Sequence, residues 1–269
     1  MSLALLLLYA ACPAAAPLPE GDAFVRGLLS SQHRREEALS RYSYDVHELR
    51  EELDRSGEVR KRRTRDFEVF VVKGHPVRRL VARDGRPLDE RARQREERRV
   101  RELAEALASG KAVSEQPGVR LARLLERYRF VAASREELHG RCAVVLDFAA
   151  LPGDFALERD SLLRRLAGRL WVDEQERAVA RVELRNTEGI RIALGIGARI
   201  SMLSFRAEFL RLEDGVWLPR SVETLAVGRK FLLSRFRVRT TTSYARYRRF
   251  EVEVQEEIGG PPGSSGGMW

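Results

Sequence analysis

Two long segments in which apolar and polar residues alternate, 42–53 and 58–72, constrain the fold of this chain more than any other feature. In the first segment Tyr44 and Val46 fall on one face and polar residues fall on the other. The residues between the segments, 54–57, read Asp-Arg-Ser-Gly, a turn sequence. Each segment is about twice the usual strand length and reaches about 40 Å at about 3.3 Å per residue. Paired strands of this length predict a strongly twisted, wrapping antiparallel sheet rather than a compact sandwich.

The rest of the chain reads mainly as short-turn strands with a few helices, so the fold class is mainly β (α+β) in one domain. Further strands are predicted at residues 77–83, 130–138, 141–149, 168–173, 178–186, 190–212, 216–227, 231–242 and 247–257. Helices are predicted at residues 22–40, 88–109, 118–128 and 159–167. The helix at 88–109 is so charged that most of its surface is expected to face solvent.

The N-terminus has the pattern of an export signal. Residues 3–11 are apolar but fall short of the ~18 residues that a membrane-spanning helix needs. Ala14-Ala15-Ala16 supplies a small-residue cleavage site, which predicts a signal peptide over 1–16 and a mature domain over 17–258. The Gly/Pro/Ser-rich tail, 259–269, is expected to be disordered, and the mature chain is expected in the periplasm without a transmembrane segment.

The two cysteines leave an alternative open at this end of the chain. Cys12 follows Tyr-Ala-Ala and is a possible lipidation site, in which case the protein is tethered to a membrane by lipid. A third reading keeps the N-terminus as a buried strand or helix. Because Cys12 either leaves with the signal or carries lipid, Cys142 is expected to be a buried thiol with no disulfide partner.

The charge pattern argues against nucleic-acid binding. The chain has 49 basic and 40 acidic residues, and its formal net charge is +9. The basic residues are spread along the chain beside acidic ones instead of forming one stripe interleaved with aromatic residues. This interspersion predicts a mixed-sign solvated surface and no nucleic-acid partner.

No motif indicates catalysis, a metal site or a cofactor. The four histidines are scattered and none has metal-ligand spacing with a partner. His47-Glu48 begins like a zinc-protease motif, but Glu51 stands where the second histidine belongs. Gly195-Ile196-Gly197 is a lone Gly-x-Gly in an apolar run, which is typical of a bend. We therefore expect a protein that is not an enzyme and needs no cofactor.

Two strand-turn-strand motifs carry a family resemblance. Gly-Arg-Leu-Trp-Val-Asp at 168–173, an acidic turn and Ala-Val-Ala-Arg-Val-Glu at 178–183 form the first, and Val-Trp-Leu-Pro-Arg at 216–220 begins the second. Over residues 22–257 the chain resembles a bacterial branch of the periplasmic lipoprotein carrier (LolA-like) superfamily, which also includes an envelope-stress regulatory protein. The resemblance implies an unclosed antiparallel β-barrel, or half-barrel, with short helices covering the concave face. It also implies a hydrophobic cavity between sheet and helices that takes acyl chains.

The expected function is therefore binding of a lipid or lipoprotein acyl chain, as carrier or receptor. The alternative is a regulatory or scaffolding module that binds another envelope protein. Candidate cavity residues are the apolar members of the alternating strands, each of which can equally belong to the ordinary core. They are Tyr44, Phe67, Val69, Val144, Leu146, Leu170, Val182, Leu184, Phe205, Phe209, Trp217 and Phe236.

Overall fold

A computed structural model describes residues 12, 16–110, 128–151, 163–192, 198–230 and 234–250. The predicted helix at 118–128 lies almost wholly outside these residues. So do the tail at 259–269 and all of the predicted signal peptide except Cys12 and Ala16.

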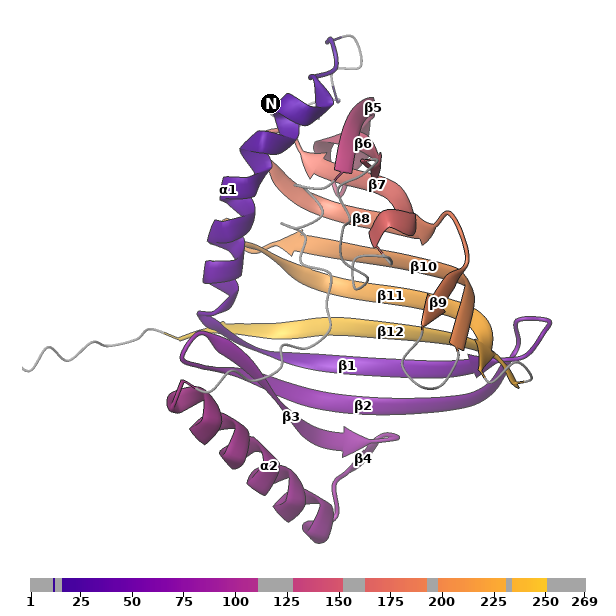
Figure 1. Ribbon diagram of the computed structural model, residues 1–269. Helices are drawn as coiled ribbons and strands as arrows, with labels where there is room; N and C mark the ends of the chain where they lie inside the picture. The colour runs from indigo at the N-terminus through magenta and orange to yellow at the C-terminus, as the bar shows by residue number, and fades with distance from the viewer. Residues whose placement is uncertain are drawn as a thin grey trace, which may run out of the picture.

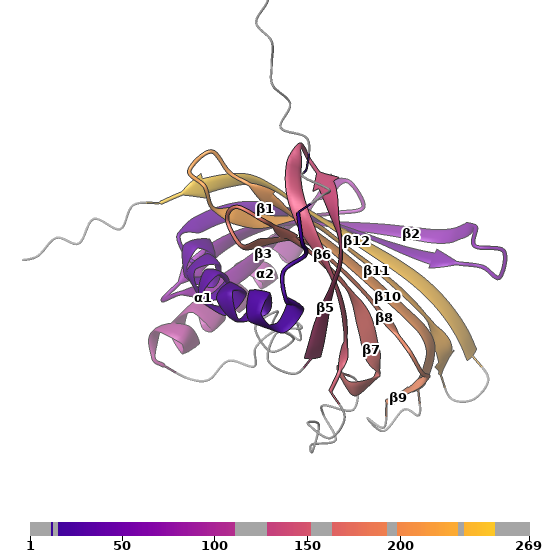
Figure 2. The same cartoon turned by 90° about the horizontal axis from the view of Figure 1, so that it is seen from above.

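Twelve strands of the described residues form one antiparallel sheet (Figure 1). Their order across the sheet is β4-β3-β2-β1-β12-β11-β10-β8-β7-β6-β5, with β9 paired to β10. The strands are β1 Tyr42–Leu53, β2 Val59–Val72, β3 His75–Arg83, β4 Arg86–Pro87, β5 Tyr128–Leu138, β6 Arg141–Ala150, β7 Leu166–Asp173, β8 Ala178–Asn186, β9 Ile190–Ile192, β10 Ala198–Arg211, β11 Trp217–Lys230 and β12 Ser234–Arg249. The two outermost strands, β4 and β5, do not pair with each other, so the sheet curves but does not close (Figure 2). The predicted fold class is confirmed: a mainly β, unclosed antiparallel barrel.

Strands β1 and β2 form the long hairpin that the alternating pattern predicted. They are paired from Tyr44–Val69 to Leu53–Val59, and Asp54 accepts hydrogen bonds within the turn from the Ser56 hydroxyl and the Glu58 N–H. The last strand, β12, pairs with β1 on one side and β11 on the other. The predicted division of this region into strands 231–242 and 247–257 is wrong, because β12 runs unbroken from Ser234 to Arg249. Arg246, at φ +53°, lies where the register with β1 shifts between the pairs Ser43–Arg248 and Asp45–Ala245, and the strand continues past it.

Helix α1, Gly21–Leu39, crosses the concave face and covers one end of the strands (Figures 1 and 2). We call this face of the sheet the inner face and the opposite one the outer face. Phe24, Val25 and Leu28 of α1 are buried against the inner-face side chains of β5 to β8. Gly21 is required here because a Cβ would lie 2.2 Å from the carbonyl oxygen of Phe130 in β5. The predicted helix at 159–167 is wrong in its second half: only a 3₁₀ turn, Leu163–Arg165, precedes β7.

The charged helix α2, Glu90–Ala108, lies along β3, next to the two-residue outermost strand β4. Asp89 caps its N-terminus by accepting a hydrogen bond from the Ala92 N–H, and Leu107 is its one buried residue. Two of its charged side chains form hydrogen bonds with the backbone of β3. Glu96 accepts from the Leu80 N–H at 2.8 Å, and Arg99 donates to the Arg78 carbonyl at 2.5 Å. The described part of the chain contains no helix with the length and apolarity needed to span a bilayer.

The disulfide in the structure was not expected. The sulfur atoms of Cys12 and Cys142 are bonded, with their Cα atoms 5.3 Å apart, which ties the N-terminal segment to β6. In a chain that keeps residue 12, the prediction that Cys142 has no partner is therefore wrong. A lipid on Cys12 would occupy the same sulfur atom, so lipidation and this disulfide exclude each other. Lipidation and cleavage after Ala16 stay predictions.

The packed core beneath α1 predicts a large loss of stability when one of its buried side chains is truncated. Replacing Leu170, which is fully buried in β7, by alanine should lower the free energy of unfolding by about 2–5 kcal/mol. The matched control is Val131→Ala in β5, because Val131 is 58% exposed and its loss should cost under about 0.5 kcal/mol. Urea denaturation followed by circular dichroism measures both. Equal losses would contradict the assignment of Leu170 to the core.

The disulfide predicts how the cysteines react with a maleimide. The full chain, refolded under oxidising conditions, should take up no label until a reductant is added. A chain beginning at Pro17 should take up one label at Cys142 without reductant, because Cys142 is only partly buried. Labelling of the oxidised full chain, counted by mass spectrometry, would show that the two sulfur atoms do not pair.

Candidate functional site

The inner face beneath α1 is filled by side chains. Five of the candidate cavity residues lie here, on strands β6, β7 and β8, and each is 6% exposed or less: Val144, Leu146, Leu170, Val182 and Leu184. They pack against α1 and against Phe148 and Phe130 of the same cluster. In this structure each of them packs against other side chains of the core. Contact of any of them with a ligand stays a prediction.

Three more candidates, Tyr44, Phe67 and Val69, belong to a second cluster where β1, β2 and β12 meet the end of α1. The rings of Tyr44 and Tyr247 lie 5.2 Å apart, and those of Tyr44 and Tyr244 lie 6.1 Å apart. The Arg78 guanidinium lies 4.0 Å from the centre of the Phe67 ring. These aromatic contacts fix the start of the long hairpin beneath the helix.

Burial changes the acidity of this tyrosine cluster. Desolvation by burial, with a smaller effect of Tyr244, raises the pKa of Tyr44 to about 12. Burial, together with the hydrogen bond that the hydroxyl donates to Asp214, raises the pKa of Tyr42 to about 12. The pKa of Tyr247 is also raised by burial, and its hydroxyl donates to the Pro219 carbonyl at 2.5 Å. Neutral tyrosines are therefore part of the folded state.

The other four candidates are dispersed. Phe205 and Phe209 in β10 are partly buried at the border of the cluster under α1. Trp217 packs with Ala178 and Ala180 in a separate cluster and donates its indole N–H to Glu176 at 2.5 Å. Phe236 lies at the far end of the sheet, where its ring sits over Gly228. The twelve candidates thus do not surround one cavity.

Beyond α1, the inner face continues as a partly exposed strip on β10, β11 and β12. The strand register places its side chains on the same face as Ala207 and Phe205, and all are small, aliphatic or threonine. We call this set the inner strip: Leu203, Val222, Thr224, Ala226, Val238 and Thr240. Sequence reasoning missed it, because half of these residues are alanine or threonine and the strand register is needed to bring them together.

The inner strip ends at charged residues on β1 and β2. Thr240 is paired with Arg50, and Arg50 with Arg63, so the two arginines lie on the same face beside the strip. Both are exposed, and neither forms an ion pair with any described residue. Glu52, which pairs with Val238 of the inner strip, lies on the same face beside Arg50 and is also exposed, so the margin of the strip carries charges of both signs.

The outer face carries a ladder of alternating charges across the strands. Each arginine of the ladder has a carboxylate on a neighbouring strand, so this part of the face neutralises itself. The ion pairs, with their N–O distances, are Arg169–Asp147 at 2.7 Å, Arg206–Glu183 at 3.5 Å, Arg239–Glu223 at 3.8 Å, Arg239–Glu51 at 3.4 Å and Arg62–Glu51 at 2.9 Å. The mixed-sign surface that the interspersed sequence predicted is thus present along this ladder.

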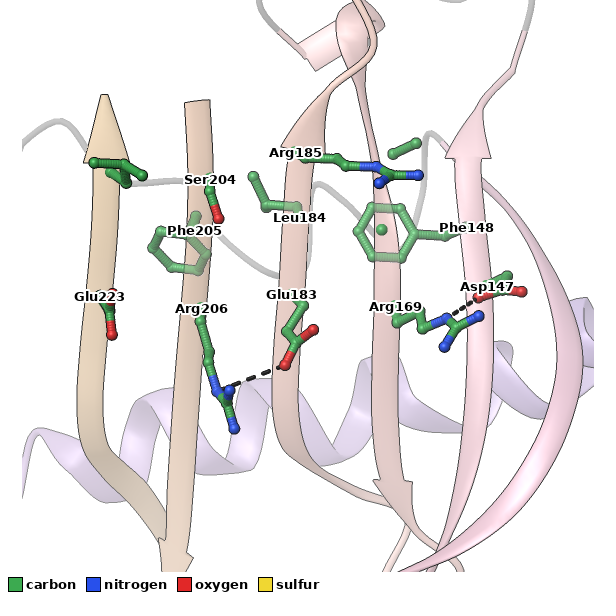
Figure 3. Close-up of a pocket in the computed structure, with 13 residues that line it drawn as sticks. Asp147, Phe148, Arg169, Glu183, Leu184, Arg185, Ser204, Phe205, Arg206 and Glu223 are labelled. Atoms are coloured by element: carbon green, nitrogen blue, oxygen red, sulfur yellow. Dashed lines mark hydrogen bonds and ion pairs between the residues drawn. The ribbon is translucent and has the colours of Figure 1, made fainter. Parts of the chain in front are cut away.

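A hollow of about 800 Å³ lies over strands β6 to β11 (Figure 3). Figure 3 shows the pairs Asp147–Arg169 and Glu183–Arg206 within it, and Phe148, Leu184 and Phe205 also contribute to its lining. Phe148 and Leu184 are buried, so the accessible groups are mainly paired charges. Arg185 of the lining is exposed and forms no ion pair with a described residue, and Phe205 and Leu225 are partly exposed, so the hollow offers a mixed rather than an apolar floor.

No described residues form a metal centre. Nowhere in the described ranges do three or more His, Cys, Asp or Glu side chains gather with the geometry to hold an ion. His47 and Asp66 form an isolated pair on the outer face, at 2.5 Å between Nδ1 and Oδ1.

A second hollow, of about 1250 Å³, lies at the far end of the sheet and is lined by arginines from three separate segments of the chain.

No family model and no curated protein matches this chain. Among solved structures, a DUF1329 family protein from Desulfovibrio piger has a TM-score of 0.38 at 9% identity, over 86% of this chain and 94% of that one. A domain named for outer membrane lipoprotein sorting, from Vibrio parahaemolyticus, has a TM-score of 0.34 at 12% identity, over 86% and 93% of the two chains. A LolA superfamily protein from Nitrosomonas europaea has a TM-score of 0.34 at 12% identity, over 85% and 94%.

The tyrosine cluster predicts alkaline unfolding. Tyr42 and Tyr44 have a pKa of about 12 when folded, against an ordinary value of 10.0, so deprotonation favours the unfolded chain. Their contribution to stability should be complete below pH 10.0 and should be lost as the pH rises towards about 12. Absorbance of tyrosinate, recorded with circular dichroism during a pH titration, checks this. If tyrosines of the folded protein ionise at the ordinary pKa, the cluster is not buried as described.

Proposed function

We propose that this chain is a non-enzymatic binding protein of the periplasm whose ligand is a lipid or lipoprotein acyl chain. The observation that carries the proposal is the inner strip, an apolar surface continuous with the core and left partly exposed beyond α1. Apolar surface in water is unfavourable by about 25 cal/mol per Å², so a strip of this kind gains from a partner.

The dimensions of the inner strip suit a hydrocarbon chain. Val222 and Ala226 are four residues apart on β11, a separation of about 14 Å at about 3.4 Å per residue. Three neighbouring strands add a width of about 10 Å. Each methylene group buried there would contribute about 0.8 kcal/mol, so several methylenes suffice for a measurable affinity.

The polar groups next to the strip indicate how such a ligand would be oriented. The threonine hydroxyls at 224 and 240 are able to bond to an ester or amide, and the Arg50 and Arg63 guanidiniums face the same side. A ligand with its polar end at β1 and β2 and its hydrocarbon on β10 to β12 would fit this margin, where Arg50 lies between Glu48 and Glu52 on the same face. This arrangement needs no group that changes protonation and no metal.

Adjacent threonines on β12 provide a matched test. Thr240 faces the inner strip and Thr241 faces outward beside Glu223, and both are partly exposed. In the Thr240→Asp variant, a carboxylate would face the hydrocarbon, so the affinity for a fluorescent fatty acid should fall at least about tenfold. Thr241→Asp should change that affinity less than about twofold. Displacement of the fluorescent fatty acid, with the thermal midpoint of each variant as a folding control, measures both.

Lipid carried through purification gives an independent measurement. Native mass spectrometry of the gently purified protein should reveal bound acyl lipid, and added lipid should raise its thermal midpoint. The proposal is refuted if the purified protein never contains lipid and added acyl ligands do not raise its thermal midpoint. Capture of a single envelope protein by such a chain would instead support the regulatory alternative.

A further inference from the structure

A row of like charges crosses three strands at the end of the sheet farthest from α1. Arg199 of β10 is paired with Arg229 of β11, which is paired in turn with Arg235 of β12. Like charges directly opposite each other on neighbouring strands destabilise a sheet. On the outer face elsewhere, the chain places a carboxylate beside each arginine of the ladder, so this row departs from the pattern of the same surface.

Three more arginines line the hollow of about 1250 Å³ to which this row belongs, and we call it the arginine hollow. Its arginines are Arg55, Arg60, Arg199, Arg229, Arg235 and Arg237. Arg55 and Arg60 come from the β1–β2 hairpin, so the sheet topology brings together residues that are about 140 or more positions apart in the sequence.

No carboxylate neutralises the arginine hollow. None of its six guanidinium groups forms an ion pair with a described residue, and the Nε of Arg237 is buried without a hydrogen-bond acceptor. The one acidic residue of the lining, Asp54, is engaged in its own turn: it accepts from the Ser56 hydroxyl at 2.6 Å and from the Glu58 N–H at 2.9 Å. The hollow is thus a site of uncompensated positive charge.

Exposed aliphatic side chains lie beside the hollow. Val59 is 44% exposed and pairs with Leu53 of the lining, and Met202 is 47% exposed and pairs with Val227 of the lining. These are two of the five large hydrophobic residues that are exposed in the described part of the chain. Exposed aliphatic groups gain when they enter the acyl region of a bilayer next to bound headgroups.

We infer that the arginine hollow docks this end of the sheet onto an anionic membrane surface, with lipid phosphates among the arginines. A free phosphate ion would use the charge but not the aliphatic groups. A nucleic acid would pair with the arginines, but the lining of the hollow supplies a single aromatic ring, Phe236, on which a base could stack. The inference does not depend on occupancy of the inner strip, because the row of Arg199, Arg229 and Arg235 lies on the outer face of the sheet.

Sedimentation with lipid vesicles tests this docking. The full chain should bind vesicles of phosphatidylcholine that contain about one third phosphatidylglycerol, and should not bind phosphatidylcholine alone. Binding should weaken steeply between about 0.1 M and 1 M salt, as the Debye length falls from about 10 Å to about 3 Å. Reversing three charges, in Arg199→Glu, Arg229→Glu and Arg235→Glu together, should lower the affinity at least about a hundredfold, since each arginine contributes about fivefold.

A matched control reverses three exposed arginines of α2, Arg91, Arg95 and Arg98, which changes the net charge equally. That control variant should keep its vesicle affinity within about threefold. The proposal fails if the control loses affinity as much as the variant with Arg199, Arg229 and Arg235 reversed, which we call the hollow variant.

A second variant, Val59→Ser with Met202→Ser, keeps every charge and should also weaken vesicle binding. This makes the test independent of the folding of the hollow variant. Equal binding to both vesicle types, or full displacement by inorganic phosphate or duplex DNA at low millimolar concentration, would overturn the inference. Fatty-acid binding by the hollow variant should be unchanged, which separates this site from the inner strip.

Discussion

The pairing of β12 with β1 is the interaction on which the architecture depends. It joins Tyr42 to Arg249 and Glu52 to Val238, residues about 190 to 210 positions apart. Without it, the hairpin of β1 and β2 with its neighbours and the strands from β5 to β12 would be two separate sheets. Contacts of such sequence separation form slowly, because the loop between them must be ordered first. The aromatic cluster around Tyr44, Tyr244 and Tyr247 stabilises this seam where it meets α1.

The seam also determines which surfaces the two faces present. On the inner face it continues the core of β5 to β8 into the inner strip and then into Arg50 and Arg63. On the outer face it carries the charge ladder from Arg206 through Glu223 and Arg239 to Glu51. The arginine hollow begins where the ladder stops. The apolar floor, the neutral surface and the cationic end are thus consequences of one strand register.

The fold was predictable from sequence to a greater degree than the sites. Alternation within a strand is a local signal, so the long hairpin and the strands around Leu170 and Val182 were predicted with nearly their observed bounds. Strand pairing is not local: the continuity of β12 and the neighbours of Arg199 depend on residues far away in the chain. Apolar alternation likewise identified Val144 and Leu146 as inward-facing but could not distinguish a core position under α1 from a wall of a cavity. The inner strip and the arginine hollow consist of residue types that are ordinary in isolation, and only the register makes them sites.

An open sheet has two edges with unpaired backbone groups, and here a helix bonds to the backbone near each edge. The Asp22 carboxylate of α1 accepts from the Phe130 N–H on β5, and Glu96 and Arg99 of α2 bond to the backbone of β3. At these residues the edge offers no template for another strand. A protein partner that adds a strand there would first have to displace the helix, so such recognition would be coupled to a change in the chain's own shape.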